Sequence, residues 1–244
     1  MAAGRGERLG ALTDKTPKPL LELAGEAILD RNLAWLAASG VDDVAINLHY
    51  LGEVIRHHVE SRPHPRMSIV FSPEEKALGT AGGAKRAASL LPVSWPLLVI
   101  YADNLVQLDI QRLVQEHKTR RADATIAVYP VTDARLSGLV EFEANGAVRS
   151  FVEKPQSPSP VPGWVNAGVY AIEEAVLRVV PEGRASDFGF DVFPRLVMDG
   201  ARIGAYPLTG DESIFPIDTA ERYEESQRAM AARLQQRRER RDQA

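Results

Sequence analysis

The residues Arg8 and Lys18 lie in one glycine-rich segment near the start of the chain, where Gly4 and Gly6 precede Arg8. Glycines in such a loop let backbone N–H groups approach phosphate oxygens, because no Cβ intervenes. The segment is not a dinucleotide-binding fingerprint, since Leu9 stands where the third glycine belongs. The pattern indicates a phosphate-binding site, with an ordinary surface arginine and a solvated lysine as the alternative reading.

A carboxylate follows the most apolar run of the chain. Residues Leu97–Tyr101 are apolar at every position, which is typical of a strand buried on both faces, and Asp103 comes two residues later. The chain has no cysteine, so oxygen ligands and a hard cation are the favoured metal chemistry. Asp103 is therefore the first candidate for a magnesium ligand, and an aspartate that caps a turn is the alternative.

Composition excludes several classes of protein. The chain has 244 residues, of which 45% are hydrophobic and 25% charged, so disorder, collagen and coiled coil are not expected. No apolar run reaches the ~18 residues of a membrane helix, and the start lacks a signal-peptide pattern. We expect a cytoplasmic protein without a membrane partner. A net charge of -4 argues against nucleic acid.

In the first half, apolar runs of strand length alternate with helical patterns, which predicts a parallel sheet covered by helices. Ligands are expected at the carboxyl ends of its strands. Strands are expected at 43–48, 67–71 and 97–101, and helices at 52–60, 83–91 and 109–118.

The second half changes to a more antiparallel, β-rich pattern. Asn145–Gly146 reads as a hairpin turn, 155–162 as an exposed loop, and a helix is expected from Thr219. Further strands are expected at 124–131, 138–143, 147–153, 165–172, 203–207 and 214–217. The chain then divides into 1–123, a nucleotide-binding half, 124–218, a β-rich half that completes the same domain, and 219–244, a C-terminal helix.

Several motifs in order resemble a known family. The opening Ala2–Leu9, followed by Pro17–Leu20, is similar to the signature of the sugar-1-phosphate nucleotidyltransferases, the nucleoside-diphosphate-sugar pyrophosphorylases. The resemblance continues over nearly the whole chain, through 78–83, Asp103, Gly138, 151–155 and 166–170. It implies a Rossmann-like α/β fold, a mostly parallel sheet flanked by helices, with a smaller β-rich sugar-binding part.

The resemblance also implies a reaction and a set of roles. The enzyme would transfer a nucleotidyl group from a nucleoside triphosphate to a sugar 1-phosphate, with magnesium, and release pyrophosphate. Arg8 and Lys18 would be catalytic, Asp103 would hold the metal, and two further groups of residues would bind the substrates. The nucleotide would contact Ala2, Ala3, Gly4, Gly6, Glu74 (or Glu75), Gly79 and Thr80, and the sugar phosphate Gly138, Glu153, Lys154, Asn166 and Gly168.

The resemblance weakens at two places. The usual metal-binding aspartate near the last helix is replaced by Pro216, so Asp218 becomes the second candidate ligand, although Asp218–Glu221 also reads as a helix N-cap. Relatives carry a few apolar residues, forming the central strand, before the segment that begins here at Met1. We therefore expect an upstream extension to stabilise the fold.

A single segment of the chain bears on which nucleotide is the substrate. Residues Ser186–Pro194 are similar to the corresponding region of heptose- and mannose-1-phosphate guanylyltransferases, which favours GTP weakly. For Glu153 and Lys154, the alternative to sugar-phosphate binding is an ordinary cross-strand pair on the surface. Two other functions stay open: a cytidylyltransferase for a phosphorylated alcohol, and a catalytically silent nucleotide-sugar-binding regulatory subunit.

Overall fold

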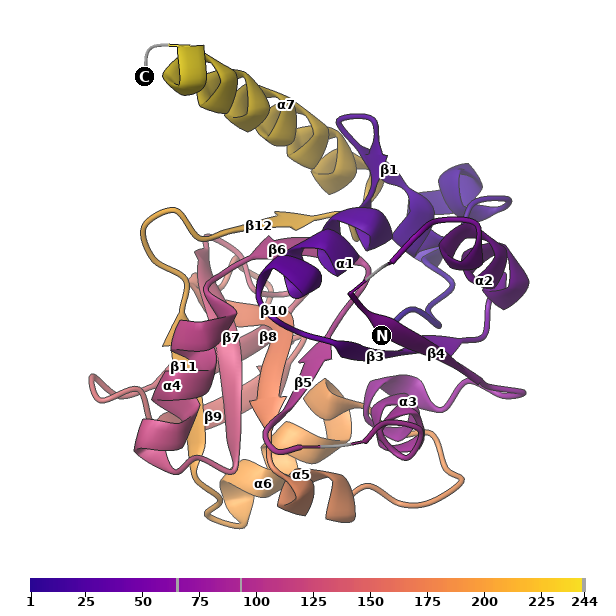
Figure 1. The fold of residues 1–244 in the computed structure, drawn as a ribbon. Coiled ribbons are helices and arrows are strands. Elements are labelled where there is room, and N and C mark those ends of the chain that lie inside the picture. The colour runs from indigo at the N-terminus through magenta and orange to yellow at the C-terminus, as the bar shows by residue number, and fades with distance from the viewer. Residues whose placement is uncertain (65, 93, 243–244) are drawn as a thin grey trace.

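The computed structural model describes residues 1–64, 66–92 and 94–242. It has a mixed α/β architecture in which helices flank a central sheet, and the long last helix, α7, projects from the body (Figure 1). The expected α/β fold class is confirmed. No helix in the described part is both long enough and apolar enough to cross a bilayer.

The first half contains the expected strands and helices in the expected order. Its elements are η1 (Glu7–Thr13), η2 (Lys18–Leu20), β1 (Glu22–Leu23), β2 (Glu26–Ala27), α1 (Ile28–Ala38), β3 (Asp43–Leu48), α2 (Gly52–Glu60), β4 (Ser68–Pro73), α3 (Gly79–Ala88), β5 (Leu97–Ile100), β6 (Asn104–Gln107) and α4 (Ile110–Arg120). Of these, α1, β1, β2, β6 and the two 3-10 segments were not predicted.

The second half is dominated by long antiparallel strands. Its elements are β7 (Ala124–Val131), β8 (Gly138–Phe142), β9 (Val148–Glu153), β10 (Gly163–Ile172), α5 (Glu174–Arg178), the π-helical turn η3 (Phe188–Val192), α6 (Phe193–Met198), β11 (Ile203–Pro207), β12 (Ser213–Pro216) and α7 (Ala220–Asp242). Residues 243–244 of the expected final helix lie outside the described residues.

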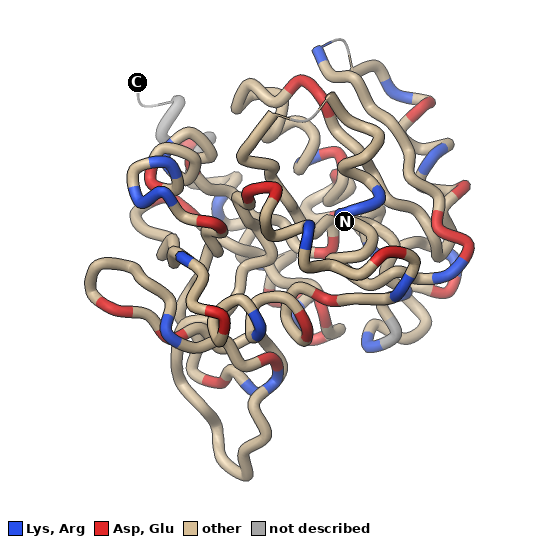
Figure 2. The backbone as a smooth tube through the Cα atoms, turned by 90° about the horizontal axis from the view of Figure 1, so that it is seen from below, with Lys and Arg blue, Asp and Glu red and all other residues tan. Residues whose placement is uncertain are grey.

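Sequence pattern explains these elements locally. The helix α1 buries Leu29, Leu33 and Leu36 at helical spacing, and the β8–β9 hairpin turns at Asn145–Gly146, where Gly146 has a φ of 84°. Lys/Arg and Asp/Glu positions are interspersed along the backbone (Figure 2). The hairpin and the alternation of element types are as predicted.

The main sheet runs β11-β7-β10-β8-β9, with β5 also paired to β10. Its β11–β7 pair is parallel and its other recorded pairs are antiparallel, while β3 and β4 form a separate parallel pair. The prediction that Leu97–Tyr101 is a strand of a parallel sheet is wrong for its pairing with β10, because β5 and β10 are antiparallel.

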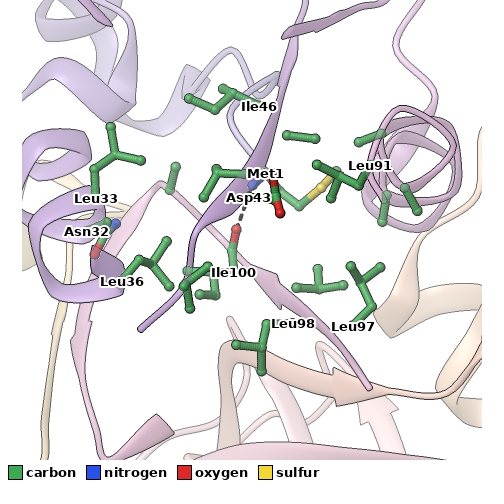
Figure 3. Close-up of a pocket in the computed structure, with 18 of the residues that line it drawn as sticks. Met1, Asn32, Leu33, Leu36, Asp43, Ile46, Leu91, Leu97, Leu98 and Ile100 are labelled. Atoms are coloured by element: carbon green, nitrogen blue, oxygen red, sulfur yellow. Dashed lines mark hydrogen bonds between the residues drawn. The ribbon is translucent and has the colours of Figure 1, made fainter. Parts of the chain in front are cut away.

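A trench of about 390 Å³ separates β3 from β5. Leu33 and Leu36 of α1 line it on one side, Leu91 after α3 lines it on the other, and Leu98 and Ile100 of β5 lie along it (Figure 3). Most of its lining side chains are apolar. The two strands therefore face each other across an apolar gap of strand length.

Met1 lines this trench and bonds to the backbone of β5 and of Ala102. Its amine donates to the Ile100 carbonyl at 2.6 Å (Figure 3), and its carbonyl accepts from the Ala102 N–H at 2.9 Å. Bonds from one residue to positions 100 and 102 of its neighbour have the parallel pattern, which sets Met1 opposite Tyr101. The chain thus runs parallel to β5 at this point.

The buried amine predicts a dependence of stability on pH. Burial lowers the pKa of the Met1 amine from 8.0 to about 6, so the unfolded chain binds more protons between those values. The free energy of unfolding is expected to rise by on the order of 2 kcal/mol from pH 6 to pH 8. Urea unfolding at both pH values measures it. An N-terminally acetylated chain keeps every other titratable group, so an equal rise in that chain would refute the assignment.

Candidate active site

Two adjoining pockets gather the residues singled out in the sequence. The Glu153 pocket has a volume of about 230 Å³, and the Glu74 pocket about 240 Å³. Both are lined by Thr80, Tyr101, Asp103 and Asp187, so the pockets meet at these four residues. A reaction between two ligands, one in each pocket, would take place at this junction.

The expected residues divide between the pockets by their predicted ligand. Gly6 lines neither pocket: it packs against Lys18 and Thr13. The Glu153 pocket is lined by Arg8, Thr80, Asp103, Gly138, Glu153, Lys154, Asn166, Gly168 and Asp218, and the Glu74 pocket by Ala2, Ala3, Gly4, Lys18, Glu74, Gly79, Thr80 and Asp103.

Lys18 and Asp103 form an ion pair at the junction, with Nζ 2.9 Å from Oδ2. The lysine side chain is 7% exposed, whereas that of Asp103 is 39% exposed. The other carboxylate oxygen, Oδ1, is buried and has no hydrogen-bond partner among the described residues. Because an unpaired buried oxygen is costly, it is a ready acceptor for a cation or a donor group.

Asp218 is held by two guanidinium groups. Arg8 Nη1 lies 3.0 Å from its Oδ2, and Arg222 Nη1 lies 3.1 Å from its Oδ1. Thr219 begins α7 by accepting from the Arg222 N–H at 3.2 Å, so the N-cap predicted at this point is present one residue further along. The pairing ties the N-terminal loop to the first turn of α7.

The glycines Gly138 and Gly189 make room for the Glu153 carboxylate. A Cβ on either would lie within 2.7 Å of Glu153 Oε2. Burial raises the pKa of Glu153, and the neighbouring Lys154 partly offsets this effect. Lys154 has a φ of 50°, a strained value for a residue with a side chain, and its Nζ lies 5.2 Å from the centre of the Phe190 ring.

Asn166 and Gly168 belong to one hydrogen-bonded unit. Asn166 donates to the Tyr170 hydroxyl at 2.7 Å and accepts from the Gly168 N–H at 2.8 Å. Gly168 has a φ of 73°, and a Cβ there would lie 3.0 Å from the Tyr101 side chain. Burial raises the pKa of both Tyr101 and Tyr170, so both stay neutral donors. Packing therefore fixes the Asn166 amide.

The backbone N–H groups at the glycine-rich start of α3 are hydrogen-bonded to other parts of the protein. Ser186 accepts from the Ala81 and Gly82 N–H groups at 2.8 and 3.1 Å, and Asp187 Oδ1 accepts from the Thr80 N–H at 3.1 Å. These bonds satisfy amides that a helix otherwise leaves free. They also explain why α3 begins at Gly79, earlier than the predicted residue 83.

Replacing Gly79 with alanine is expected to destabilise the fold. Gly79 has a φ of 72°, and a Cβ would lie 2.5 Å from the Ser186 carbonyl oxygen. Strain and clash together should cost about 2–4 kcal/mol, or roughly 5–10 °C in Tm. Gly200→Ala is the matched control, because Gly200 has a φ of 73° with no atom nearby. Equal losses in the two variants would show that the contact with Ser186 contributes nothing.

The donor set fits a magnesium ion at Asp103. No cluster of three metal-type side chains exists in the described part of the chain. Magnesium, however, takes one or two carboxylates and completes its shell with water and substrate phosphates. The orphaned Oδ1 of Asp103 offers one such ligand, whereas both oxygens of Asp218 already accept from arginines.

Ten of the residues that line the Glu153 pocket were not predicted from the sequence, among them four that contact predicted site residues. Tyr101, Asp187, Phe190 and Arg222 all line the Glu153 pocket. Asp187 and Phe190 lie in the 186–194 segment, which attracted notice only for its likeness to guanylyltransferases. The signal that could have identified them is the run Asp187–Phe190, in which phenylalanines and a glycine follow an aspartate, an unusual start for a helix. Arg222 offered none, because a charged residue in a helix is usually solvent-facing.

Most of the chain is similar to known proteins. A family model described as "Nucleotidyl transferase" matches residues 1–212. The chain is 31% identical to a UTP–glucose-1-phosphate uridylyltransferase of Synechocystis sp. and 32% identical to a mannose-1-phosphate guanylyltransferase of Mycobacterium tuberculosis. Each match covers 82% of this chain and 55% of the relative, so the chain spans about half the length of these curated relatives.

Solved structures show the same fold. The crystal structure of HddC from Yersinia pseudotuberculosis superposes with a TM-score of 0.78 at 23% identity, covering 93% of this chain and 96% of that one. A second structure of that protein, complexed with GMP-PN, has the same TM-score at 24% identity. At this identity the likeness supports the fold class alone.

Proposed function

The chain belongs to the nucleotidyl transferase family, and from that premise we propose that it transfers a nucleotidyl group from a nucleoside triphosphate to a sugar 1-phosphate. The observation that carries the proposal is the Lys18–Asp103 pair at the junction of two pockets. One pocket suits each substrate. A cation and an orphaned carboxylate oxygen at their boundary suit phosphates that meet there.

We assign the nucleoside triphosphate to the Glu74 pocket. Its wall at Ala2, Ala3 and Gly4 is backbone with small side chains, which lets a flat base approach closely. The Glu74 carboxylate accepts from the Leu78 N–H at 2.9 Å and from Asn47 at 2.8 Å. Glu74 lines this pocket and keeps lone pairs that a base N–H would use.

We assign the sugar 1-phosphate to the Glu153 pocket. Glu153 and the Asn166 amide offer acceptors and a donor for hydroxyl groups, and Lys154 offers an ammonium for the phosphate. The pocket thus offers both hydrogen-bonding groups for hydroxyls and a cation for a phosphate, which suits a sugar phosphate.

The reaction then follows by direct displacement. A phosphate oxygen of the sugar 1-phosphate attacks the α-phosphorus, and the bond from that phosphorus to the pyrophosphate oxygen breaks as the new P–O bond forms. Lys18 neutralises charge at the α-phosphate. Arg8, whose side chain is 49% exposed, turns from Asp218 to the departing pyrophosphate. No covalent intermediate is needed, since such transfers depend on positioning and charge.

Magnesium, when bound, supplies positive charge to the phosphates. Asp103 would hold it through Oδ1, and Asp218 is the second candidate ligand once Arg8 leaves it. Lys18 keeps its contact with Oδ2 of Asp103 and so holds that carboxylate in place.

The test is pyrophosphate release across the four nucleoside triphosphates and several sugar 1-phosphates, with phosphocholine as a non-sugar acceptor. GTP is the first donor to test, from the 186–194 resemblance, although the relatives include guanylyl-, uridylyl- and adenylyltransferases. Activity with one sugar phosphate supports the proposal. Activity confined to phosphocholine supports the cytidylyltransferase alternative, and nucleotide binding without turnover supports the regulatory one.

A further inference from the structure

The π-helical turn η3 lines the Glu153 pocket, and Asp187, the residue before it, lines both pockets. Just before it, Asp187 accepts from the Thr80 hydroxyl at 3.0 Å, where the pockets meet. Within it, Gly189 packs on Glu153 and Phe190 packs on Lys154. Irregular turns of this type are frequent at functional sites. One short segment therefore contacts the start of α3 and both members of the Glu153–Lys154 pair.

Phe190 differs from the other phenylalanines of this segment. Phe188 and Phe193 are fully buried in the core, whereas Phe190 is 58% exposed. Its ring lines the Glu153 pocket, as does Leu136, which is 50% exposed. A charged and hydroxyl-binding pocket thus carries two large apolar side chains that the fold leaves uncovered.

The Lys154 ammonium lies 5.2 Å from the centre of the Phe190 ring. This cation–π contact favours one placement of the ring beside the ammonium. A ligand whose anionic group reaches Lys154 must therefore bring the atoms next to that group close to the phenyl ring. In a cyclic sugar phosphate those atoms are the ring carbons, which expose C–H groups.

We propose that Phe190 determines acceptor specificity by packing against the C–H face of a cyclic sugar whose phosphate is held by Lys154. The inference rests on the proposed function and adds to it a residue, Phe190, that contacts the sugar ring of the acceptor. A phosphorylated open-chain alcohol has no ring face to cover the phenyl group, so it gains less from the contact.

The experiment compares wild-type protein with Phe190→Ala, Phe190→Tyr and the control Met198→Ala, whose side chain is 80% exposed and does not line either pocket. In Phe190→Ala, KM for the sugar 1-phosphate should rise about tenfold, with kcat and KM for the nucleotide within about twofold. Phe190→Tyr should stay close to wild type because it keeps the ring.

Binding of the nucleotide-sugar product, with the nucleoside diphosphate as the control ligand, gives a readout that does not depend on turnover. Calorimetry should show that Phe190→Ala weakens binding of the nucleotide sugar about tenfold and leaves binding of the nucleoside diphosphate unchanged. Unchanged KM in Phe190→Ala, or a fall in kcat with KM unchanged, would overturn the inference. A wild-type protein that turns over no sugar phosphate would instead refute the proposed function.

Discussion

Replacing Asp103 with asparagine is expected to lower kcat/KM for nucleotidyl transfer by at least about 100-fold. Asparagine keeps the size of the side chain and an oxygen that can accept from Lys18, but it removes the negative charge that would hold magnesium. Because Lys18 is 7% exposed, the variant leaves a buried ammonium without its counter-charge, so a modest loss of stability is expected too.

Two measurements separate the catalytic effect from the structural one. Thermal unfolding reports how much folded Asp103→Asn is present at the assay temperature, and the magnesium concentration for half-maximal rate should rise if the carboxylate holds the ion. Asp199→Asn is the control, because that side chain is 58% exposed and its recorded ion pair is with Arg195 on α6. Wild-type rates in a folded Asp103→Asn protein would exclude Asp103 from the mechanism.

Four apolar residues added ahead of Met1 are expected to raise Tm by at least about 5 °C, which corresponds to roughly 2 kcal/mol for a chain of this size. Met1 already lies opposite Tyr101 in the parallel pattern, so the added positions would lie opposite Leu97–Ile100 and fill the trench. Residues on both faces must be apolar, because α1 lines one side of the trench and α3 the other.

The control for this extension has the same length but alternates serine and glycine. It removes the charged amine from Met1, as the apolar extension does, but supplies no side chains to bury. The apolar extension should therefore exceed the control in Tm, while both should abolish the rise in stability between pH 6 and 8. Equal Tm values for the two extended chains would show that the trench does not accept a strand.

The sequence by itself determined the type and order of most elements, although it did not predict α1, β1, β2 or β6. Strands 43–48, 124–131 and 203–207 and helix 52–60 were predicted with the bounds that the structure has, because hydrophobic periodicity is a local property of the chain. Nearly all the site residues that the family motifs named line the two pockets, since glycines and charged residues near turns carry a chemical signal of their own.

Only the tertiary structure decided which of these residues meet. The Lys18–Asp103 pair joins positions 85 residues apart, and the Arg8–Asp218 pair joins positions 210 apart. The antiparallel partner of β5 and the entry of Phe190 and Arg222 into the Glu153 pocket also depend on packing between distant segments. Periodicity indicates which face of an element is buried, but not which other element packs against that face. The packing partner decides which charged side chains come together in the site.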